Sequence, residues 1–288
     1  MPVNRERTST FSRMLLAYCS GLLLLGAATN ILASNGPQRI VSINVCTDQL
    51  LAILVDKERI VSLSHLAGDP HSSWLGPFAD GLPLNHGTAE EVIALDPDLI
   101  VTAPFSFRPT ISILKKLGYT VLELPIAKNL NEISANLTLL ASAVGKNEQT
   151  QTAIELFNKK IASETTTPNL PLPLFVSYEA NGWTMGKNSL INNVAQKAGF
   201  ETIGARLNFS GGRRVDLEKL LTLEPELIEL GHQWNESPAL VSEAMWHPAL
   251  QELLKRTMLI NIPDSLWLCG STKTIDVLHI LQRALDDL

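Results

Sequence analysis

The sequence predicts an α/β protein built from two similar lobes. One observation is a pattern that occurs twice, in residues 90–100 (EEVIALDPDLI) and residues 218–228 (EKLLTLEPELI). In both copies a glutamate precedes a proline by seven residues, as expected for a short amphipathic helix that stops before a buried strand. A second observation is that β-rich and helical segments alternate along the chain. Together they favour two Rossmann-like lobes, each with a parallel sheet.

The first lobe is expected over residues 34–146. Thr88 and Glu91 have the spacing of a capping box, which opens the first copy of the repeated pattern. Thr47 or Asp48 is the expected N-cap of the first helix. The predicted strands of this lobe are residues 39–44, 60–64, 99–102 and 120–124, and its predicted helices are residues 49–55, 110–117 and 131–144.

A single long helix, Glu148–Ser163, is predicted to join the lobes within residues 147–165, with Asn147 as its N-cap. Its length is about 24 Å at the usual rise per residue. One helical connection predicts lobes that rotate little against each other.

The second lobe, residues 166–288, begins in a stretch rich in threonine and proline (TTTPNLPLP). Asp216 is the expected N-cap of the second copy of the pattern. The predicted strands are residues 174–178, 227–230 and 258–262, and the predicted helices are residues 189–198 and 274–285.

Composition excludes several classes of function. The chain has 288 residues, of which 45% are hydrophobic and 18% charged, so it is long and apolar enough to bury two cores. Its formal net charge is −6, and it has no block rich in lysine and arginine. Binding to nucleic acid or to an anionic membrane therefore has no electrostatic basis.

The N-terminus, residues 1–33, has the order of a secretory signal peptide. Arg5, Arg7 and Arg13 precede an apolar run that ends in small residues. Cleavage after Ala28 and cleavage after Ala33 are both compatible with this order. The alternative is a retained membrane anchor, although glycine and polar residues interrupt the run.

Export would leave two cysteines, Cys46 and Cys269, in an oxidising compartment. Each is expected in a loop that faces a cleft between the lobes, Cys46 in the first lobe and Cys269 in the second. A disulfide would tie the lobes together if their Cα atoms lie within about 7 Å. Two separately buried thiols are the alternative.

Six segments carry a resemblance to a known family. They are RIVSINVCTDQLL, GTAEEVIALDPDLIV, LKKLGYTVLELP, GWTMGKNSLINNVAQKAGF, RRVDLEKLLTLEPELI and LWLCGSTKTIDVLHIL, which together span about residues 38–285. The chain resembles the helical-backbone substrate-binding proteins of ABC importers, which deliver ferric siderophores, haem and cobalamin. The resemblance implies a monomeric periplasmic receptor without a cofactor of its own, and an ABC permease dimer in the inner membrane as its partner.

Ligands of parallel α/β lobes lie beyond the carboxyl ends of the strands. Aromatic side chains in the loops there suit a large ring-like ligand, and arginines suit an anionic one. The arginines favour a ferric siderophore as the ligand, with cobalamin second. Packing of each side chain on its own lobe is the alternative at every position, and we expect it at about half of them. The candidate ligand-binding residues are His65, Trp74, Asn85, Phe105, Phe107, Arg108, Trp183, Arg213, Arg214, His232, Trp234 and Trp267.

Other functions are less well supported by the sequence. His65, His86 and His232 could approach a free metal ion, but no clear acidic fourth ligand accompanies them. The motifs of serine hydrolases, zinc proteases, phosphate-binding loops and dinucleotide-binding folds are absent, so we expect a binding protein and not an enzyme. A periplasmic haem binder and a sensor of the same fold remain alternatives.

Glu90 and Glu218 occupy equivalent positions in the two copies of the repeated pattern. Each lies in the first turn of a helix, where the helix dipole alone favours a carboxylate. In the family that the chain resembles, glutamates at the matching positions pair with arginines of the two permease subunits. The resemblance therefore implies that Glu90 and Glu218 dock the protein on its permease.

Overall fold

The structure is a computed structural model that describes residues 36–145, 147–164, 170–179, 182–231 and 247–288. The predicted signal peptide, residues 1–33, lies outside these ranges, and so do His232 and Trp234. Within the described ranges, no helix is both long enough and apolar enough to cross a membrane.

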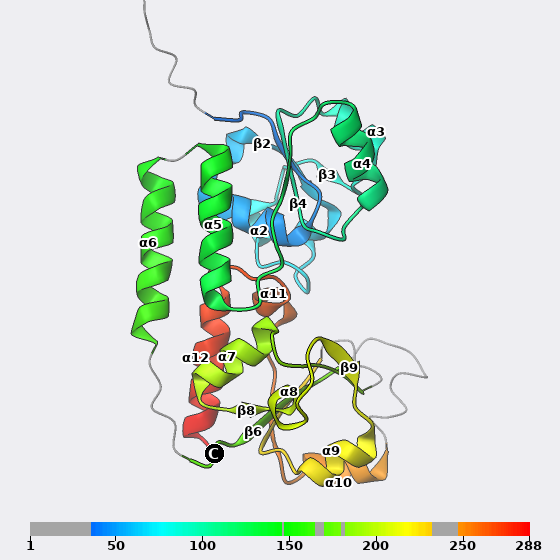
Figure 1. Ribbon diagram of the computed structural model, residues 1–288, viewed down its shortest axis with the longest axis vertical. Coiled ribbons are helices and arrows are strands. Elements are labelled where there is room, and N and C mark those ends of the chain that lie inside the picture. The colour runs from blue at the N-terminus through cyan, green and yellow to red at the C-terminus, as the bar shows by residue number, and fades with distance from the viewer. Residues whose placement is uncertain (1–35, 146, 165–169, 180–181, 232–246) are drawn as a thin grey trace, which may run out of the picture. The chain divides into compact units, whose positions relative to one another are not determined.

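The N-terminal lobe is built on a five-stranded sheet in the order β3-β2-β1-β4-β5, in which all neighbours are parallel (Figure 1). All residues of β1 and β4 are buried, as expected for central strands covered on both faces. The elements of this lobe are β1 (Ile40–Ser42), α2 (Val45–Leu54), β2 (Ile60–Ser64), β3 (Leu84–Asn85), α3 (Ala89–Ala94), β4 (Leu99–Thr102), α4 (Arg108–Lys116) and β5 (Val121–Glu123), with short 3-10 turns at residues 57–59, 65–68 and 76–78.

The C-terminal lobe has a four-stranded parallel sheet in the order β11-β10-β6-β8. It also has a two-stranded antiparallel ribbon, β7-β9, where the sequence analysis expects a loop around Arg213 and Arg214. The elements of this lobe are β6 (Leu174–Tyr178), β7 (Trp183–Met185), α7 (Leu190–Ala198), β8 (Glu201–Thr202), α8 (Ile203–Arg206), β9 (Gly212–Arg214), α9 (Leu217–Leu223), β10 (Leu227–Leu230), α10 (Pro248–Leu254), β11 (Met258–Ile260), α11 (Asp264–Trp267) and α12 (Thr274–Asp286).

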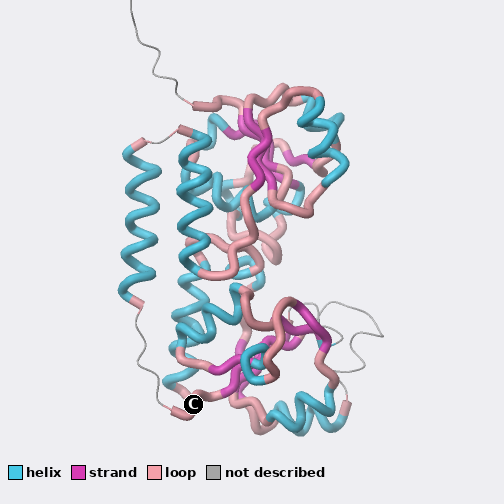
Figure 2. Tube along the Cα trace, in the orientation of Figure 1, coloured by secondary structure: helices cyan, strands magenta, loops and turns pink. Residues whose placement is uncertain are grey.

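One long helix, α6 (Glu148–Ser163), joins the lobes and lies beside α5 (Leu130–Val144) (Figures 1 and 2). The predicted N-cap is present, because the Asn147 side chain accepts from the Thr150 backbone N–H and Thr150 returns a bond to the Asn147 N–H. The predicted architecture of two lobes with parallel sheets and one connecting helix is therefore confirmed.

The two lobes share one hydrophobic core. A single cluster of buried residues includes Leu51 and Leu137 of the N-terminal lobe, Phe157 of α6, and Phe175 and Leu278 of the C-terminal lobe. Smaller clusters belong to one lobe each. The shared core makes residues 36–288 one compact unit.

The first helix begins earlier than predicted. Asn44, and not Thr47 or Asp48, is its N-cap, and the Asn44 side chain accepts from the backbone N–H of Cys46 at 2.9 Å. Thr47 and Asp48 lie inside the helix and are buried. The Asp48 carboxylate instead accepts hydrogen bonds from the backbone and hydroxyl of Ser64 on β2.

Candidate ligand-binding site

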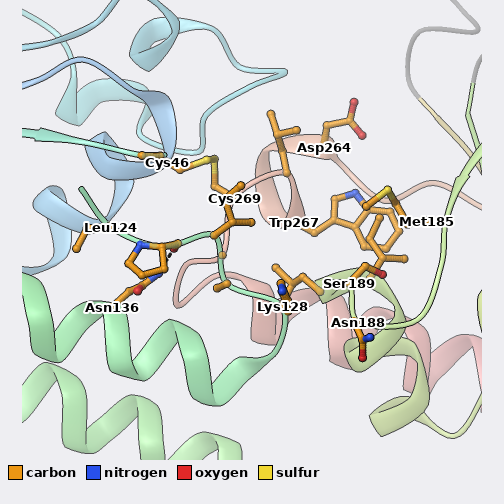
Figure 3. A pocket seen from close by; sticks show the side chains of 18 of the residues that line it. Cys46, Leu124, Lys128, Asn136, Met185, Asn188, Ser189, Asp264, Trp267 and Cys269 are labelled. Atoms are coloured by element: carbon orange, nitrogen blue, oxygen red, sulfur yellow. Dashed lines mark hydrogen bonds between the residues drawn. A yellow bond between two sulfur atoms is a disulfide. The ribbon is translucent and has the colours of Figure 1, made fainter. Parts of the chain in front are cut away.

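A cavity of about 700 Å³ lies where loops of the two lobes meet (Figure 3). Its volume is in the range of sites that hold small molecules and cofactors. Its walls come from the segments that follow strands β1, β4, β5, β6 and β11, as expected for the carboxyl ends of parallel strands. The residues that these segments contribute are Cys46, Thr47, Ala103, Leu124, Pro125, Ile126, Ala127, Lys128, Glu179, Asp264, Trp267, Leu268, Cys269 and Gly270.

Two of the predicted aromatic residues line this cavity. Trp267, at the end of α11, is only 5% exposed, and its ring centroid lies 6.4 Å from that of Phe175 in the core. Trp183, on β7, is 49% exposed. Its indole lies flat on Gly212 of β9, where an added Cβ would come within 2.3 Å of the ring. The β7-β9 ribbon thus holds Trp183 at the cavity.

The charged residues that line the cavity, among those described, are Lys128, Glu179 and Asp264. Burial raises the pKa of Glu179, and the negative charge of Asp264 raises it further. Behind them, Glu229 on β10 is almost fully buried and accepts a hydrogen bond from the Ser177 hydroxyl at 2.8 Å. Burial raises the pKa of Glu229 to about 8. Glu229 therefore keeps its proton at neutral pH, and the carboxyl groups that line the C-terminal wall of the cavity are those of Glu179 and Asp264.

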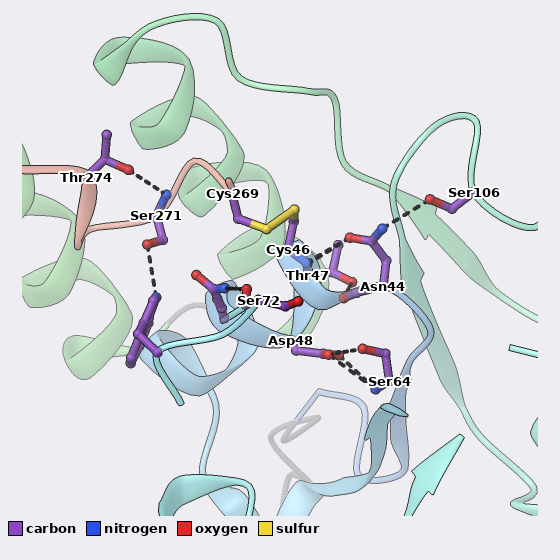
Figure 4. Close-up of a disulfide and its surroundings, with 12 residues drawn as sticks. Asn44, Cys46, Thr47, Asp48, Ser64, Ser72, Ser106, Cys269, Ser271 and Thr274 are labelled. Carbon is purple, nitrogen blue, oxygen red and sulfur yellow. Dashed lines mark hydrogen bonds between the residues drawn. A yellow bond between two sulfur atoms is a disulfide. The ribbon is translucent and has the colours of Figure 1, made fainter. Parts of the chain in front are cut away.

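The predicted disulfide is present. Cys46 and Cys269 are bonded, their Cα atoms lie 5.0 Å apart, and both residues line the cavity (Figure 4). The bond joins the first turn of α2 in the N-terminal lobe to the segment after α11 in the C-terminal lobe. The sequence separation of the two cysteines is 223 residues.

Trp74 and Asn85 lie apart from the described cavity lining. The Trp74 indole N–H donates to the Ser271 hydroxyl at 3.1 Å, a contact between the lobes. Asn85 is buried, and its amide donates to the carbonyls of Ser42 and Leu63 and to the Ser62 hydroxyl. These three contacts of the Asn85 amide nitrogen with the neighbouring strands make Asn85 a structural bridge within the N-terminal sheet.

His65 is exposed and stacks on His86, with 4.9 Å between the ring centroids. His86 Nδ1 lies 3.1 Å from the Glu91 carboxylate. Within the described ranges, no group of three or more histidine, cysteine, aspartate or glutamate residues is placed to hold a metal ion. His232 and Trp234, the remaining candidates after β10, belong to the undescribed segment.

Phe105 and Phe107 lie in the loop after β4 and Arg108 begins α4, but of the residues from this loop only Ala103 lines the described cavity. Phe105 is 72% exposed, and the Arg108 guanidinium carbon lies 4.7 Å from the centroid of its ring. Phe105 and Phe107 have φ values of 72° and 48°, in the left-handed region that bulky residues rarely adopt. The Asn44 amide donates to the Ser106 hydroxyl at 3.0 Å and so fixes the loop to the start of α2.

Arg213 and Arg214 are exposed on β9 and do not line the described cavity. The Arg213 guanidinium carbon lies 4.9 Å from the centroid of the Phe209 ring. Arg214 Nε lies 3.8 Å from the Asp216 carboxylate. Adjacent strand residues point to opposite faces, so the two arginines do not act on one ligand group together.

Several cavity residues are not among the sequence candidates. Pro125, Ile126 and Ala127 follow β5, and the rule on strand ends could have included them, but apolar side chains give no chemical signal in the sequence. Glu179 directly follows β6 and Asp264 begins α11, and each could have been found as an acidic residue at a strand-to-helix turn. Met185 and Asn188 depend on the ribbon, which the sequence analysis does not predict.

A family model described as a periplasmic binding protein matches residues 40–255. The chain belongs to this family. It is 23% identical over 208 residues to a cobalamin-binding protein of Halobacterium salinarum, which covers 70% of this chain and 56% of that relative. The chain thus spans little more than half the length of this curated relative.

Solved structures of periplasmic binding proteins share the fold. One is a periplasmic vitamin B12-binding protein of Vibrio cholerae, with a TM-score of 0.66, 19% identity, and coverage of 87% of this chain and 97% of that one. Another is a periplasmic haem-binding protein of Roseiflexus sp. RS-1, with a TM-score of 0.71, 18% identity, and coverage of 86% and 99%. These relatives are solute-binding proteins and not enzymes.

Proposed function

We propose that this protein captures a bulky metal chelate in the cavity between its lobes and delivers it to an ABC permease in the inner membrane. The observation that carries the proposal is the cavity itself, which lies at the strand ends of two lobes and is lined by Trp183, Trp267 and many apolar residues. Such a wall suits a large ring-like ligand. Export to the periplasm by residues 1–33 is part of the same proposal.

The charge of the cavity favours cobalamin over an anionic siderophore. Arg108, Arg213 and Arg214 favour a siderophore from the sequence, but none of the three lines the described cavity. Its described wall carries Glu179 and Asp264, with Lys128 as the cation. Two carboxylates repel an anionic chelate and accept hydrogen bonds from the amide groups of a corrinoid. The curated relative and the Vibrio cholerae structure, both named as binders of this vitamin, support the same choice.

Haem is the second candidate. The observation in its favour is Met185, which lines the cavity and whose thioether is a known type of haem-iron ligand. The two propionates of haem count against it in a cavity with an acidic wall.

Calorimetry with cyanocobalamin, a ferric hydroxamate, a ferric catecholate and haem tests the ligand. We expect cyanocobalamin to bind one-to-one with a Kd below about 1 μM. The proposal is refuted if none of the four compounds binds with a Kd below about 100 μM. Trp183→Ala should weaken binding about tenfold or more, because the indole is a cavity wall. Arg213→Ala on the neighbouring strand is the matched control and should leave the affinity unchanged. If both variants lose affinity equally, Arg213 contributes to binding, and an anionic siderophore becomes the favoured ligand.

We further propose that Glu90 and Glu218 contact the permease. Both are exposed, in the first turns of α3 and α9, and these helices lie on the side of the molecule away from α6 (Figure 1). Two pseudo-equivalent lobes provide two matching contacts for a two-fold permease. Carboxylates at a rim mainly set the association rate and orientation.

The double variant Glu90→Ala, Glu218→Ala should keep its ligand affinity and lose uptake and permease binding. Glu58→Ala, Asp286→Ala removes one exposed carboxylate from each lobe away from α3 and α9 and serves as the control. The loss should be largest at low salt, where charge pairs are least screened. Normal uptake by the first double variant would leave helix capping as the only role of these residues.

A further inference from the structure

The disulfide occupies an unusual place for a bond that only stabilises the fold, because it forms part of the wall of the ligand cavity. Cys46 and Cys269 come from different lobes, and both line the cavity together with Trp267 (Figure 3). Trp267 stands two residues before Cys269. Whatever fixes Cys269 therefore also fixes the aromatic wall.

The segment Cys269–Ser271 is anchored against the N-terminal lobe at three successive residues. Cys269 is bonded to Cys46. Gly270 lies so close to that lobe that an added Cβ would come within 2.9 Å of the side chains of Ala127 and Ile133. The Ser271 hydroxyl accepts the bond from Trp74. The disulfide is the one covalent anchor of the three.

The two sulfur-bearing residues differ in access. Cys269 is 1% exposed, whereas Cys46 is partly exposed. Since both line the cavity, the open cavity is a path by which a small reductant can reach the bond. A ligand that fills the cavity would cover this path.

We propose that the Cys46–Cys269 bond is a redox-sensitive clasp of the ligand cavity: its reduction weakens ligand binding, and bound ligand shields it from reduction. The existence of the clasp does not depend on which ligand binds; only the choice of cyanocobalamin as a probe rests on the proposed function. The reductant is a small dithiol.

The exchange is balanced as follows. One thiolate of the dithiol attacks Sγ of Cys46, the Cys46–Cys269 bond breaks, and Cys269 leaves as a thiolate that takes up a proton. The second thiol of the reductant, as a thiolate, then attacks the reductant's sulfur in the mixed disulfide. Cys46 is released as a thiolate that takes up a proton. The reductant becomes a cyclic disulfide, and the two electrons and two protons reside on the protein thiols.

Thermodynamic linkage gives the effect of reduction on ligand affinity an equilibrium counterpart, whereas the shielding from reduction is kinetic and rests on the covered path through the cavity. If reduction lowers ligand affinity by a given factor, ligand must favour the oxidised form by the same factor. The shared core of the two lobes remains after reduction, so we expect a local loosening of residues 266–271 and not separation of the lobes.

The test uses the full chain in three measurements. First, hydrogen exchange of residues 266–271 is compared with and without dithiothreitol, in the absence of ligand; we expect exchange about tenfold faster after reduction. Second, the rate of reduction is followed by thiol alkylation and mass spectrometry, and saturating cyanocobalamin should slow it about tenfold. Third, calorimetry of Cys46→Ser, Cys269→Ser should show cyanocobalamin binding about tenfold weaker than in the wild type.

Trp74→Phe is the matched control, because it removes the hydrogen bond to Ser271 but keeps an aromatic ring and the disulfide. The affinity of this variant should change less than threefold. If the double variant does not fold, the wild type reduced in place replaces it, with the exchange protection of β6 and β10 as the check on folding. Wild-type binding with an unchanged affinity after reduction would overturn the clasp and leave the proposed function intact. If cyanocobalamin does not bind, the proposal of cobalamin as the ligand fails. The clasp is then tested by the hydrogen exchange of residues 266–271 without ligand, and exchange that is unchanged after reduction overturns it.

Discussion

The two lobes contain the same repeated segment but hold it with different numbers of polar contacts. In the N-terminal lobe, the Asp98 carboxylate accepts from the backbone N–H groups of Gln38 at 2.6 Å and Arg39 at 2.9 Å, just before β1. In the C-terminal lobe, the equivalent Glu226 accepts from the backbone N–H of Leu174 alone among the described residues, at 2.7 Å, where β6 begins. The acidic residue after each proline thus ties the repeated strand to the first strand of its lobe.

The helix that begins each copy also has more polar capping contacts in the N-terminal lobe than in the C-terminal lobe. Thr88 caps α3 in a complete capping box with Glu91, whereas Asp216 makes no side-chain cap bond to α9. The backbone path is nevertheless the same, because the residue before each proline is left-handed, with φ of 45° at Asp96 and 48° at Glu224. The repeated pattern therefore encodes the path of the chain, while the polar contacts that secure it are specific to each lobe.

Among the substitutions that compare the two lobes, loss of the disulfide should have the largest effect on stability. A bond between residues 223 apart stabilises the fold by about 5 kcal/mol in the loop-entropy model. We expect Cys46→Ser, Cys269→Ser to lower the free energy of unfolding in urea by that order. Hydrogen exchange should then show the more weakly capped C-terminal lobe opening at a lower free energy than the N-terminal lobe. Equal opening energies in the two lobes would contradict the ranking.

The second largest effect concerns one buried carboxylate in each lobe. Burial raises the pKa of Asp48 to about 6, although hydrogen bonds from Ser42 and Ser64 oppose the shift. Burial raises the pKa of Glu229 to about 8, opposed by the bond from Ser177 and assisted by the carboxylates of Glu179 and Asp264. The more extensive hydrogen bonding in the N-terminal lobe thus favours ionisation of Asp48 at a lower pH.

The sign of the pH effect follows from proton linkage. An acid whose pKa is raised on folding keeps its proton in the native state while the unfolded chain has released it, so stability falls as pH rises between the two pKa values. Between pH 6 and pH 8 the larger change comes from Glu229, because Asp48 is already about half ionised at pH 6. Over that range the free energy of unfolding of the wild type should fall by up to about 2 kcal/mol. Glu229→Gln should not show this fall, whereas Asp48→Asn should behave like the wild type. Urea unfolding at the two pH values measures this; parallel curves for all three proteins would refute it.

The third effect compares the two acidic residues that follow the prolines. Asp98→Ala removes two charge-assisted bonds to backbone N–H groups and should cost about 2 kcal/mol. Glu226→Ala removes one and should cost about 1 kcal/mol. Chemical denaturation of both variants checks the order, with Asp98→Asn and Glu226→Gln as controls of matched size. A larger loss for Glu226→Ala would show that the number of bonds does not set the stability of the two copies.

Much of the fold could be predicted from the sequence because apolar runs are bounded by turn residues. The predicted strands at residues 99–102, 174–178 and 227–230 coincide with β4, β6 and β10. The β7-β9 ribbon could not be predicted, because it pairs two short strands and brings the Trp183 indole against Gly212, which stands 29 residues later in the chain. Likewise, the earlier start of α2 depends on Thr47 and Asp48 bonding within the N-terminal lobe instead of capping the helix.

The site was harder to predict than the fold. Rules that select aromatic, basic and other polar residues at strand ends found Trp183 and Trp267, but they also selected Arg213 and Asn85, which make contacts elsewhere. The cavity wall after β5 is mostly apolar and carries no chemical signal. A disulfide between the lobes was foreseeable from two cysteines at strand ends, although only the folded chain brings their Cα atoms together.

The smallest effect should come from the left-handed residues before the two prolines. Aspartate and asparagine tolerate this region better than glutamate does, because their short polar side chains can bond locally. Glu224→Asn should therefore raise stability by about 0.5 kcal/mol, whereas Asp96→Asn should be close to neutral. The ion pair that Glu224 makes with Arg256, at 3.3 Å, is exposed and should subtract little. Precise urea midpoints can resolve the difference. The loss of stability in Arg256→Ala measures the ion pair. If Glu224→Asn loses more stability than Arg256→Ala, then Glu224 makes stabilising contacts in the C-terminal copy that the N-terminal copy lacks.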